Sequence, residues 1–259
     1  MKNKELVGNF IILGADGNLG PVWTKAVIES GGKVTGLGLR VSTDAKLTSL
    51  FQQFPDMLEL VDFDLVSDQF HFLDPLLPKE ISGVVLNAGI DSLPGAGHAV
   101  IEDFHLEEWK HTFEVNLFGN VNFLNYLLKS DKVKNASIVV VGSMYSQVSP
   151  PKDLYSHFND GEGSVKNPAY AASKAALASV VRQYGTDLAS RGIRVNMLSP
   201  GGVVGNQDKV FIEKFEAKSP SKKMIQPEIL GGHLVYLLSS MSMSLVGQNL
   251  LVDDGYSVW

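Results

Sequence analysis

The chain has no cysteine among its 259 residues. This absence excludes disulfide bonds, thiolate metal sites and a cysteine nucleophile at once. We accordingly expect no bound metal. A chain without disulfides also fits the reducing cytoplasm, where we expect this protein to act.

The chain also lacks an excess of positive charge and a long apolar run. Its 22 Lys and Arg residues against 28 Asp and Glu give a net charge of −6, so no basic surface for nucleic acid or for a membrane is predicted. Residues 7–13 are too short and too interrupted by glycine and asparagine for a signal sequence or a membrane span. We expect the partner to be a small-molecule substrate.

Short apolar segments alternate with segments of helical periodicity along the chain. This alternation is typical of βαβ crossovers, and the length and composition fit one α/β domain over residues 1–259. We predict a Rossmann-type, doubly wound parallel sheet of about seven strands with helices on both faces. Strands are expected at residues 9–13, 33–37, 58–63, 83–87, 137–141, 193–198 and 249–253, and helices at 20–30, 44–54, 69–77 in part, 107–129, 168–191 and 226–240.

An inserted loop at residues 146–166 interrupts this alternation. Loops of this length inside a compact domain are usually functional or disordered. Two prolines and the side chains of Tyr155, His157 and Phe158 favour a shaped lid over a site. A mobile surface loop is the alternative.

A glycine-rich turn joins the first predicted strand to the first predicted helix. Glycines there allow a sharp turn and close approach of the backbone to a phosphate, and the helix N-terminus offers free N–H groups to a pyrophosphate. The turn therefore predicts a dinucleotide site, with a plain tight turn as the alternative. Its candidate binding residues are Gly14, Asp16, Gly17, Asn18, Leu19 and Gly20.

Tyr170 and Lys174 stand four residues apart near the start of the predicted helix 168–191. That spacing places them on one helix face, one turn apart. A phenol has a reference pKa of about 10, and an adjacent ammonium is expected to lower it. The pair is a candidate general acid/base for neutral pH, and an exposed aromatic beside an exposed amine is the alternative.

Further motifs occur in order along the chain, each at a predicted strand end or helix face. Together with the glycine spacing, the Tyr170/Lys174 pair and the length, they resemble those of the short-chain dehydrogenase/reductase family over nearly the whole chain. They are Asp64-Leu65, Asn87-Ala88-Gly89, Asn116, Ser143, Pro200-Gly201 and Val252-Asp253-Asp254-Gly255.

The resemblance implies an NAD(P)-dependent oxidoreductase that interconverts a hydroxyl and a ketone. In that family's pattern Ser143 orients the reacting oxygen, Tyr170 transfers the proton, and Lys174 lowers the tyrosine pKa and holds the ribose. Asn116 holds a water that links the lysine to solvent. Beyond the glycine turn, the implied cofactor contacts are Arg40, Asp64, Leu65, Asn87, Ala88, Gly89, Tyr170, Lys174, Pro200, Gly201 and Val203. The chain departs from the pattern in the wider Ser143-to-Tyr170 separation.

The choice of cofactor depends on the end of the second predicted strand. An acidic residue there would bind the ribose hydroxyls and repel a 2′-phosphate, but Gly38 stands at this place. Arg40 could pair with a phosphate, whereas Asp16 could accept from ribose hydroxyls. On balance the sequence favours NADP, with NAD as the alternative.

Within the family the chain is similar to oxidoreductases of bacterial flagellin modification and surface-sugar synthesis. The residues that carry this likeness are Gly142-Ser143-Met144-Tyr145, the proline-rich segment ending near Tyr155, residues 198–203 with Asn206 and Gln207, and residues 252–259. It implies a sugar, sugar phosphate or nucleotide sugar contacted by Ser143, Tyr145, Gln147, Tyr170, Gly202 and Gln207, with Lys152, His157, Lys222 and Lys223 as candidate phosphate ligands. The alternatives are a reductase of 3-oxoacyl groups or other small ketones, and a non-catalytic cofactor-sensing protein.

The predicted helices 107–129 and 168–191 carry apolar stripes. Family members pair such helices between subunits, so the resemblance implies a homodimer or homotetramer. Packing of the same stripes against the chain's own sheet is the alternative.

Overall fold

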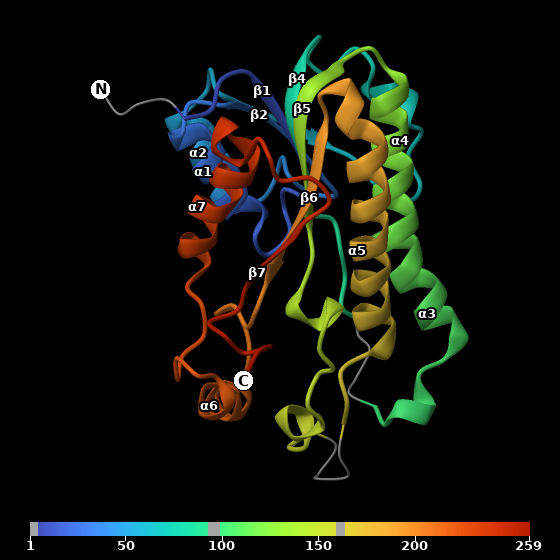
Figure 1. The fold of residues 1–259 in the computed structure, drawn as a ribbon, viewed down its shortest axis with the longest axis vertical. Helices are drawn as coiled ribbons and strands as arrows, with labels where there is room; N and C mark the ends of the chain where they lie inside the picture. Colours follow the sequence, from blue (N-terminus) through green and yellow to red (C-terminus); the bar gives the residue numbers. More distant parts are fainter. Residues whose placement is uncertain (1–4, 93–98, 159–163) are drawn as a thin grey trace.

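A parallel sheet forms the centre of the computed structural model, which describes residues 5–92, 99–158 and 164–259 (Figure 1). Its strand order is β3-β2-β1-β4-β5-β6-β7, and neighbouring strands pair in parallel. The predicted seven-stranded Rossmann-type sheet is thereby confirmed. The strands are β1 (Asn9–Leu13), β2 (Lys33–Gly38), β3 (Leu58–Asp62), β4 (Ile81–Leu86), β5 (Val133–Val141), β6 (Arg194–Pro200) and β7 (Asn249–Val252).

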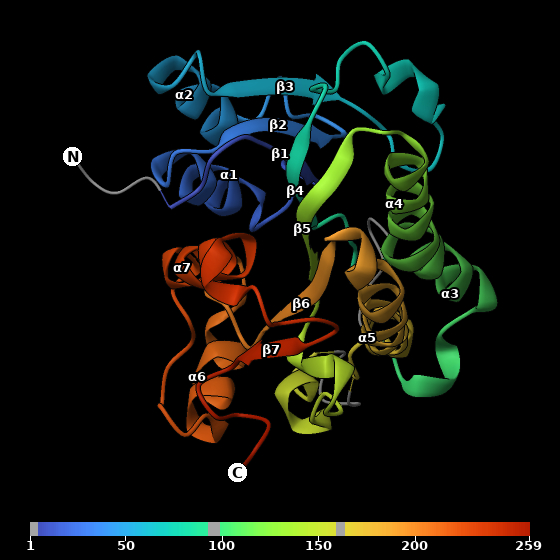
Figure 2. The same cartoon turned by 45° about the horizontal axis from the view of Figure 1, so that its top comes forward.

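Helices cover both faces of this sheet (Figure 2). Because strand side chains alternate between faces, Ile11 and Leu13 of β1 join the core beneath one helical layer, and Phe10 and Ile12 join the core beneath the other. Burial on both sides explains the run of apolar residues from Phe10 to Leu13 in β1. One layer contains α1 (Gly20–Glu29), α2 (Ala45–Gln53) and α7 (Pro227–Leu238), and the other contains α3 (Leu106–Phe113), α4 (Asn120–Lys129) and α5 (Pro168–Leu188).

The strand order reverses between β1 and β4. At such a switch point the loops that follow the two strands diverge, and a crevice forms at the carboxyl ends of the strands. The segments that follow β1, β4, β5 and β6 all begin at this edge. The motifs found in the sequence therefore share one edge of the sheet.

Two helical segments differ from the expectations. The predicted helix 107–129 changes at η3 (Glu114–Gly119), a π-helical turn between α3 and α4. An unpredicted helix, α6 (Lys209–Lys218), begins after Asp208, whose carboxylate accepts a hydrogen bond from the Phe211 N–H at 3.0 Å. No helix in the described ranges is long and apolar enough to cross a bilayer.

The predicted insertion 146–166 contains ordered structure between β5 and α5. The short turns η4 (Met144–Ser146) and η5 (Lys152–Tyr155) lie at its start, and Leu154 and Tyr155 are buried. Residues 159–163 of the predicted insertion lie outside the described ranges.

Candidate active site

The turn between β1 and α1 leaves no space for side chains at two of its glycines. Gly14 has φ +76°, and a Cβ there would lie 2.6 Å from the backbone nitrogen of Ala88. A Cβ on Gly20 would lie 2.1 Å from the Ala15 carbonyl oxygen. No side chain caps the start of α1 at Leu19, so its N-terminal dipole faces the crevice uncompensated. This cradle fits the pyrophosphate of a dinucleotide.

Asn87, directly after β4, ties the glycine turn to the neighbouring strand. Its Nδ2 donates to the Gly14 carbonyl at 2.7 Å, and its Oδ1 accepts from the Trp23 indole N–H at 2.9 Å. Ala88 is held in turn, because Asn120 Nδ2 donates to its carbonyl at 2.9 Å. The segment predicted to form the cofactor wall therefore lies against the glycine turn.

Asp16 and Gly38 meet at the end of β2. A Cβ on Gly38 would lie only 2.0 Å from Asp16 Oδ1, so the carboxylate lies where a side chain at position 38 would begin. The Arg40 backbone N–H donates to Asp16 Oδ2 at 2.8 Å and fixes the carboxylate there. An acidic group is thus present at this strand end, although the strand itself does not supply it.

Ser143, Tyr170 and Lys174 come together near the segment after β4, where a Cβ on Gly89 would lie 3.3 Å from Lys174 Nζ. Ser143 follows the end of β5 and is buried, and it interacts with the Tyr170 phenol by hydrogen bonding. Lys174 lies one turn along α5, with Nζ 5.7 Å from the Tyr170 ring centroid. The long chain between Ser143 and Tyr170 does not separate them.

The pKa of Tyr170 lies above its ordinary value in this structure, whereas a lowered value was predicted. Burial raises the pKa of Tyr170 to about 12, the Ser143 interaction opposes this rise, and the Asp91 carboxylate adds to it. Burial also lowers the pKa of Lys174 to about 8, and its ammonium donates to the Val141 carbonyl at 2.9 Å. The phenol is therefore protonated at neutral pH.

Asn116 lies in the π-helical turn η3 and is buried. Its Oδ1 accepts from the Ile90 N–H at 2.7 Å, and its Nδ2 donates to the Ile90 carbonyl at 2.8 Å and to Ser173 Oγ at 3.0 Å. A Cβ on Gly89 would lie 3.3 Å from both Asn116 Oδ1 and Lys174 Nζ. The amide thus attaches the loop after β4 to α5.

Phenol groups gather on the other side of Tyr170. Tyr145, directly after Met144, and Tyr155 of η5 interact by hydrogen bonding. Both also interact electrostatically with Tyr170 and with Tyr256. Burial raises the pKa of Tyr155 to about 12. Beside these phenols lies a small apolar cluster formed by Met144, Leu154, Phe215 and Met224.

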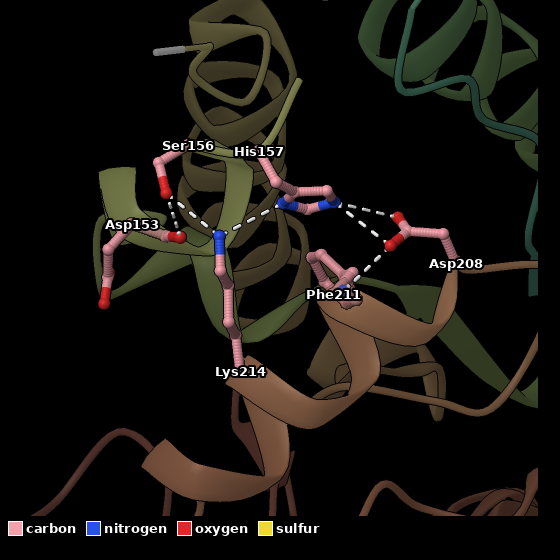
Figure 3. A network of polar contacts seen from close by, with 6 residues as sticks. All are labelled: Asp153, Ser156, His157, Asp208, Phe211 and Lys214. Carbon is pink, nitrogen blue, oxygen red and sulfur yellow. Dashed lines mark hydrogen bonds and ion pairs between the residues drawn. The ribbon is translucent and has the colours of Figure 1, made fainter. Parts of the chain in front are cut away.

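A polar network joins the insertion to α6 (Figure 3). Lys214 Nζ donates to Ser156 Oγ at 2.9 Å and contacts His157 Nδ1 at 3.2 Å. Because an ammonium can only donate, Nδ1 accepts, and the opposite ring nitrogen of His157 donates to Asp208 at 3.1 Å. Tyr155 also packs on Phe211, with ring centroids 5.6 Å apart. We call residues 150–158 together with α6 the cap.

Four residues that were predicted to contact the substrate make other contacts or are exposed. The Gln207 amide bonds to Gly205 N and Val203 O within its own loop, and Gln147 is exposed. A Cβ on Gly202 would lie 2.2 Å from the Phe215 ring, so this glycine permits α6 to pack closely. Lys222 donates to the Ala217 carbonyl and lies over the Trp259 ring.

Two residues that were predicted to contact the cofactor also make contacts within the protein. The Asp64 carboxylate accepts from the Val66 N–H at 2.9 Å at the start of a turn after β3. The Leu65 side chain is buried and packs within the core against Gly119. At the far side of the crevice, the Gly201 N–H donates to the Val252 carbonyl at 2.8 Å and continues the pairing of β6 with β7.

Comparison with known proteins identifies the family of this chain. A family model described as enoyl-(acyl carrier protein) reductase matches residues 74–257, which is more than half of the chain. The chain belongs to the short-chain dehydrogenase/reductase family. As in other members of that family named dehydrogenases or reductases, it is an NAD(P)-dependent oxidoreductase.

Individual relatives span nearly the whole chain or a short part of it. The chain is 24% identical to 2,3-dihydro-2,3-dihydroxybenzoate dehydrogenase of Escherichia coli (strain K12), with 95% of this chain and 96% of that protein covered. It is 25% identical to the NADH-dependent L-xylulose reductase of Ambrosiozyma monospora, with 96% and 94% covered. It is 38% identical over 89 residues to post-translational flagellin modification protein A of Campylobacter coli, with 34% and 35% covered.

A solved structure shows the same fold with a cofactor. A short-chain dehydrogenase from Leptospira borgpetersenii serovar Hardjo-bovis (strain JB197), with bound NAD⁺, superposes with a TM-score of 0.80 at 25% identity. The superposition covers 100% of this chain and 97% of that one.

Proposed function

We propose that this short-chain dehydrogenase/reductase interconverts a hydroxyl and a ketone on a sugar, sugar phosphate or nucleotide sugar in cytoplasmic surface-glycan biosynthesis. The observation that carries the proposal is the meeting of Ser143, Tyr170 and Lys174 beside the glycine turn. These three side chains place a hydrogen-bond donor, an acid and a cation at the edge of the sheet where a dinucleotide fits.

The residues divide the chemistry as follows. The glycine turn, the segment Asn87–Ala88–Gly89 and Lys174 would hold the dinucleotide, and the bound nicotinamide supplies or accepts the hydride. Ser143 and Tyr170 hydrogen-bond the reacting oxygen and fix its position. Tyr170, protonated at neutral pH, donates its proton to the oxygen during reduction.

A carbohydrate substrate is supported by the phenols around Tyr170. Tyr145, Tyr155 and Tyr256 offer hydroxyl groups that donate and accept, on aromatic rings that can pack against a sugar ring. Relatives whose names refer to xylulose and to flagellin modification support the same class. The likeness to the flagellin protein supports the surface-glycan role.

We propose NAD rather than NADP as the preferred cofactor. The Asp16 carboxylate, fixed by Arg40 N–H at the end of β2, would accept from ribose hydroxyls and repel a 2′-phosphate. Arg40, which favoured NADP in the sequence, contributes its backbone to this arrangement.

A substrate screen tests the proposal. The purified protein is incubated with NADH or NADPH and with keto-sugars, keto-sugar phosphates, nucleotide keto-sugars and 3-oxoacyl thioesters. We expect turnover of a carbohydrate, and a loss of roughly 10²- to 10⁴-fold in kcat in Tyr170→Phe without loss of cofactor binding. Near-normal turnover by Tyr170→Phe would remove the assigned acid.

The runner-up is reduction of 3-oxoacyl groups or other small ketones. The apolar cluster of Met144, Leu154, Phe215 and Met224 beside the phenols favours it, because an acyl chain needs an apolar wall. Turnover of 3-oxoacyl thioesters alone in the screen would select this alternative.

A further inference from the structure

An ion pair lies beside Tyr170 that the family motifs do not include. Lys166 Nζ lies 2.5 Å from Asp91 Oδ2 and 4.9 Å from the centroid of the Tyr170 ring. The side chain of Lys166 is 18% exposed and that of Asp91 is 60% exposed. One charge of each sign therefore lies near Tyr170, with the ammonium over its ring.

Neighbouring contacts fix both charges. Ile90, directly before Asp91, is held on both backbone groups by the Asn116 amide. Val165, directly before Lys166, donates its N–H to the Ala99 carbonyl at 3.0 Å in an antiparallel bridge. Asn167, directly after Lys166, caps α5 through a 2.9 Å bond to the Ala169 N–H. The distance from the pair to the phenol is thus set by the fold.

The two charges act on the phenol in opposite senses. A carboxylate nearby disfavours the phenolate, whereas an ammonium nearby favours it. The Asp91 carboxylate contributes to the raised pKa of Tyr170 and of Tyr155. The other polar and titratable groups that face Tyr170 are Ser143, Tyr145, Tyr155 and Lys174.

We propose that Asp91 and Lys166 are positioning residues that tune proton transfer at Tyr170, with Asp91 adding to the effect of burial in favour of the protonated phenol and Lys166 opposing Asp91. The protonated phenol is the form that donates a proton when a ketone is reduced. In that direction the phenol O–H bond breaks as the O–H bond of the product alcohol forms, and solvent returns a proton to the phenolate. A bound reduced dinucleotide would supply the hydride that the carbonyl carbon accepts. The inference rests on the proposed function, because it takes Tyr170 as the acid.

Opposite shifts in two single variants test the proposal. Asp91→Asn removes the carboxylate, keeps an oxygen that can accept from Lys166, and leaves the ammonium uncompensated. We expect it to lower the pKa of Tyr170 by about one unit or more. Lys166→Met leaves the carboxylate uncompensated and should raise that pKa, and the double variant should return close to the wild-type value. Asp103→Asn, which removes one exposed carboxylate from the neighbouring segment, is the matched control.

Two readouts separate the inference from the function on which it rests. The first readout is the pKa of Tyr170, measured without substrate from the ultraviolet absorbance of tyrosinate as each variant is titrated. The same variant carrying Tyr170→Phe gives the absorbance of the other tyrosines, which is subtracted. The pH profiles of kcat for reduction and oxidation then follow, with KM expected to stay within about threefold of wild type. Asp91→Asn should move the alkaline loss of reduction to lower pH and speed oxidation at neutral pH.

Shifts of the same sign in both single variants, or an Asp91→Asn titration equal to that of Asp103→Asn, overturn the inference. Normal turnover in Tyr170→Phe instead overturns the proposed function. Thermal unfolding of each variant establishes that it folds. If Asp91→Asn does not fold, Lys166→Met decides, since an unchanged or lowered Tyr170 pKa in that variant is also contrary.

Discussion

Asp16 shows how one side chain can change the expected chemistry of a strand end. With Gly38 at the end of β2, the acid that binds ribose hydroxyls would be missing if the glycine turn did not supply it. The turn supplies this acid through Asp16. A side chain at position 38 would collide with the carboxylate, because a Cβ on Gly38 would lie 2.0 Å from Asp16 Oδ1. Under the proposed NAD preference, residue 16 rather than residue 38 would select the cofactor.

Asp16→Asn should weaken the preference for the cofactor without a 2′-phosphate. The amide keeps the shape and the acceptor for Arg40 N–H but loses the charge that repels a phosphate. We expect the NADPH-to-NADH ratio of Kd values, measured by fluorescence titration, to fall roughly tenfold, the equivalent of about 1.4 kcal/mol. Asp56→Asn, which removes an exposed carboxylate at the opposite end of β3, is the control. Equal ratios in wild type and Asp16→Asn would contradict the proposal.

Lys174 makes stability depend on pH in a defined window. Burial lowers its pKa from 10.5 to about 8, so between these values the unfolded chain binds a proton that the folded chain does not. Stability from this group is therefore lost as pH falls toward 8 and gained as pH rises toward 10.5. Between about pH 8 and pH 9.5 the gain is about 2 kcal/mol.

Comparison with Lys174→Met isolates this contribution. The difference in free energy of unfolding between wild type and variant, from urea denaturation, should move in favour of wild type by about 2 kcal/mol as pH rises from about 8 to about 9.5. Staying below pH 9.5 avoids ionisation of exposed tyrosines. A constant difference would show that Lys174 is not held at a lowered pKa.

At the scale of elements, α5 and η3 act together. Asn167 caps the start of α5, and Tyr170 and Lys174 lie on the buried side of this helix. The π-helical turn η3 places the Asn116 amide within hydrogen-bonding distance of Ile90 and Ser173. In a regular α-helix the side chains after η3 would point in different directions. Such π-helical turns are common at functional sites. The two helices thus hold the loop after β4 in place.

Lys214→Ala should loosen the cap. This substitution removes the bonds from α6 to Ser156 and His157, each of which contributes about 0.5–1.5 kcal/mol. We expect KM for the substrate to rise by up to roughly tenfold, with faster amide hydrogen exchange in residues 150–158. Lys209→Ala is the matched control, because Lys209 stands on the same helix and makes only an exposed pair with Glu213 at 3.6 Å. Equal behaviour of the two variants would show that the network does not hold the cap.

The sequence predicts the sheet well because its inner strands are buried on both sides. Such strands appear as apolar runs between turns, and the carboxyl ends of parallel strands must share an edge. The meeting of Ser143 with Tyr170 of α5 was implied by the family resemblance, and the structure brings the two together.

The remaining features depend on contacts between distant residues. The helix α6 packs on Tyr155, more than fifty positions earlier. The pKa of Tyr170 depends on burial by segments remote in sequence, and Asp91 and Lys166 stand 75 residues apart. Local sequence patterns do not indicate such pairs. The helix α6 could have been predicted, because Asp208 is an N-cap residue and Phe211 and Phe215 follow it at helical spacing.

For the whole molecule, the helices α3, α4 and α5 lie together on one side of the sheet (Figure 1). The apolar stripes predicted on helices 107–129 and 168–191 pack largely within the chain, because Phe123, Leu127 and Leu177 are buried in the core. A row of aromatic rings remains further out, where Trp109 and Phe118 each lie 6.3 Å from Phe113. We therefore expect a homodimer or homotetramer that covers this row.

Phe118→Arg should reduce the size of the assembly. Phe118 is 48% exposed, and a buried subunit interface of roughly 1,200–2,000 Å² has no place for an unpaired guanidinium at its centre. Light scattering coupled to size-exclusion chromatography should show dimer or tetramer for wild type and a smaller species for the variant. Phe72→Arg is the matched control, because Phe72 is 53% exposed on a turn outside the α3–α5 layer and should leave the mass unchanged. A monomeric wild type, or equal masses for Phe118→Arg and wild type, would place the interface elsewhere or exclude it.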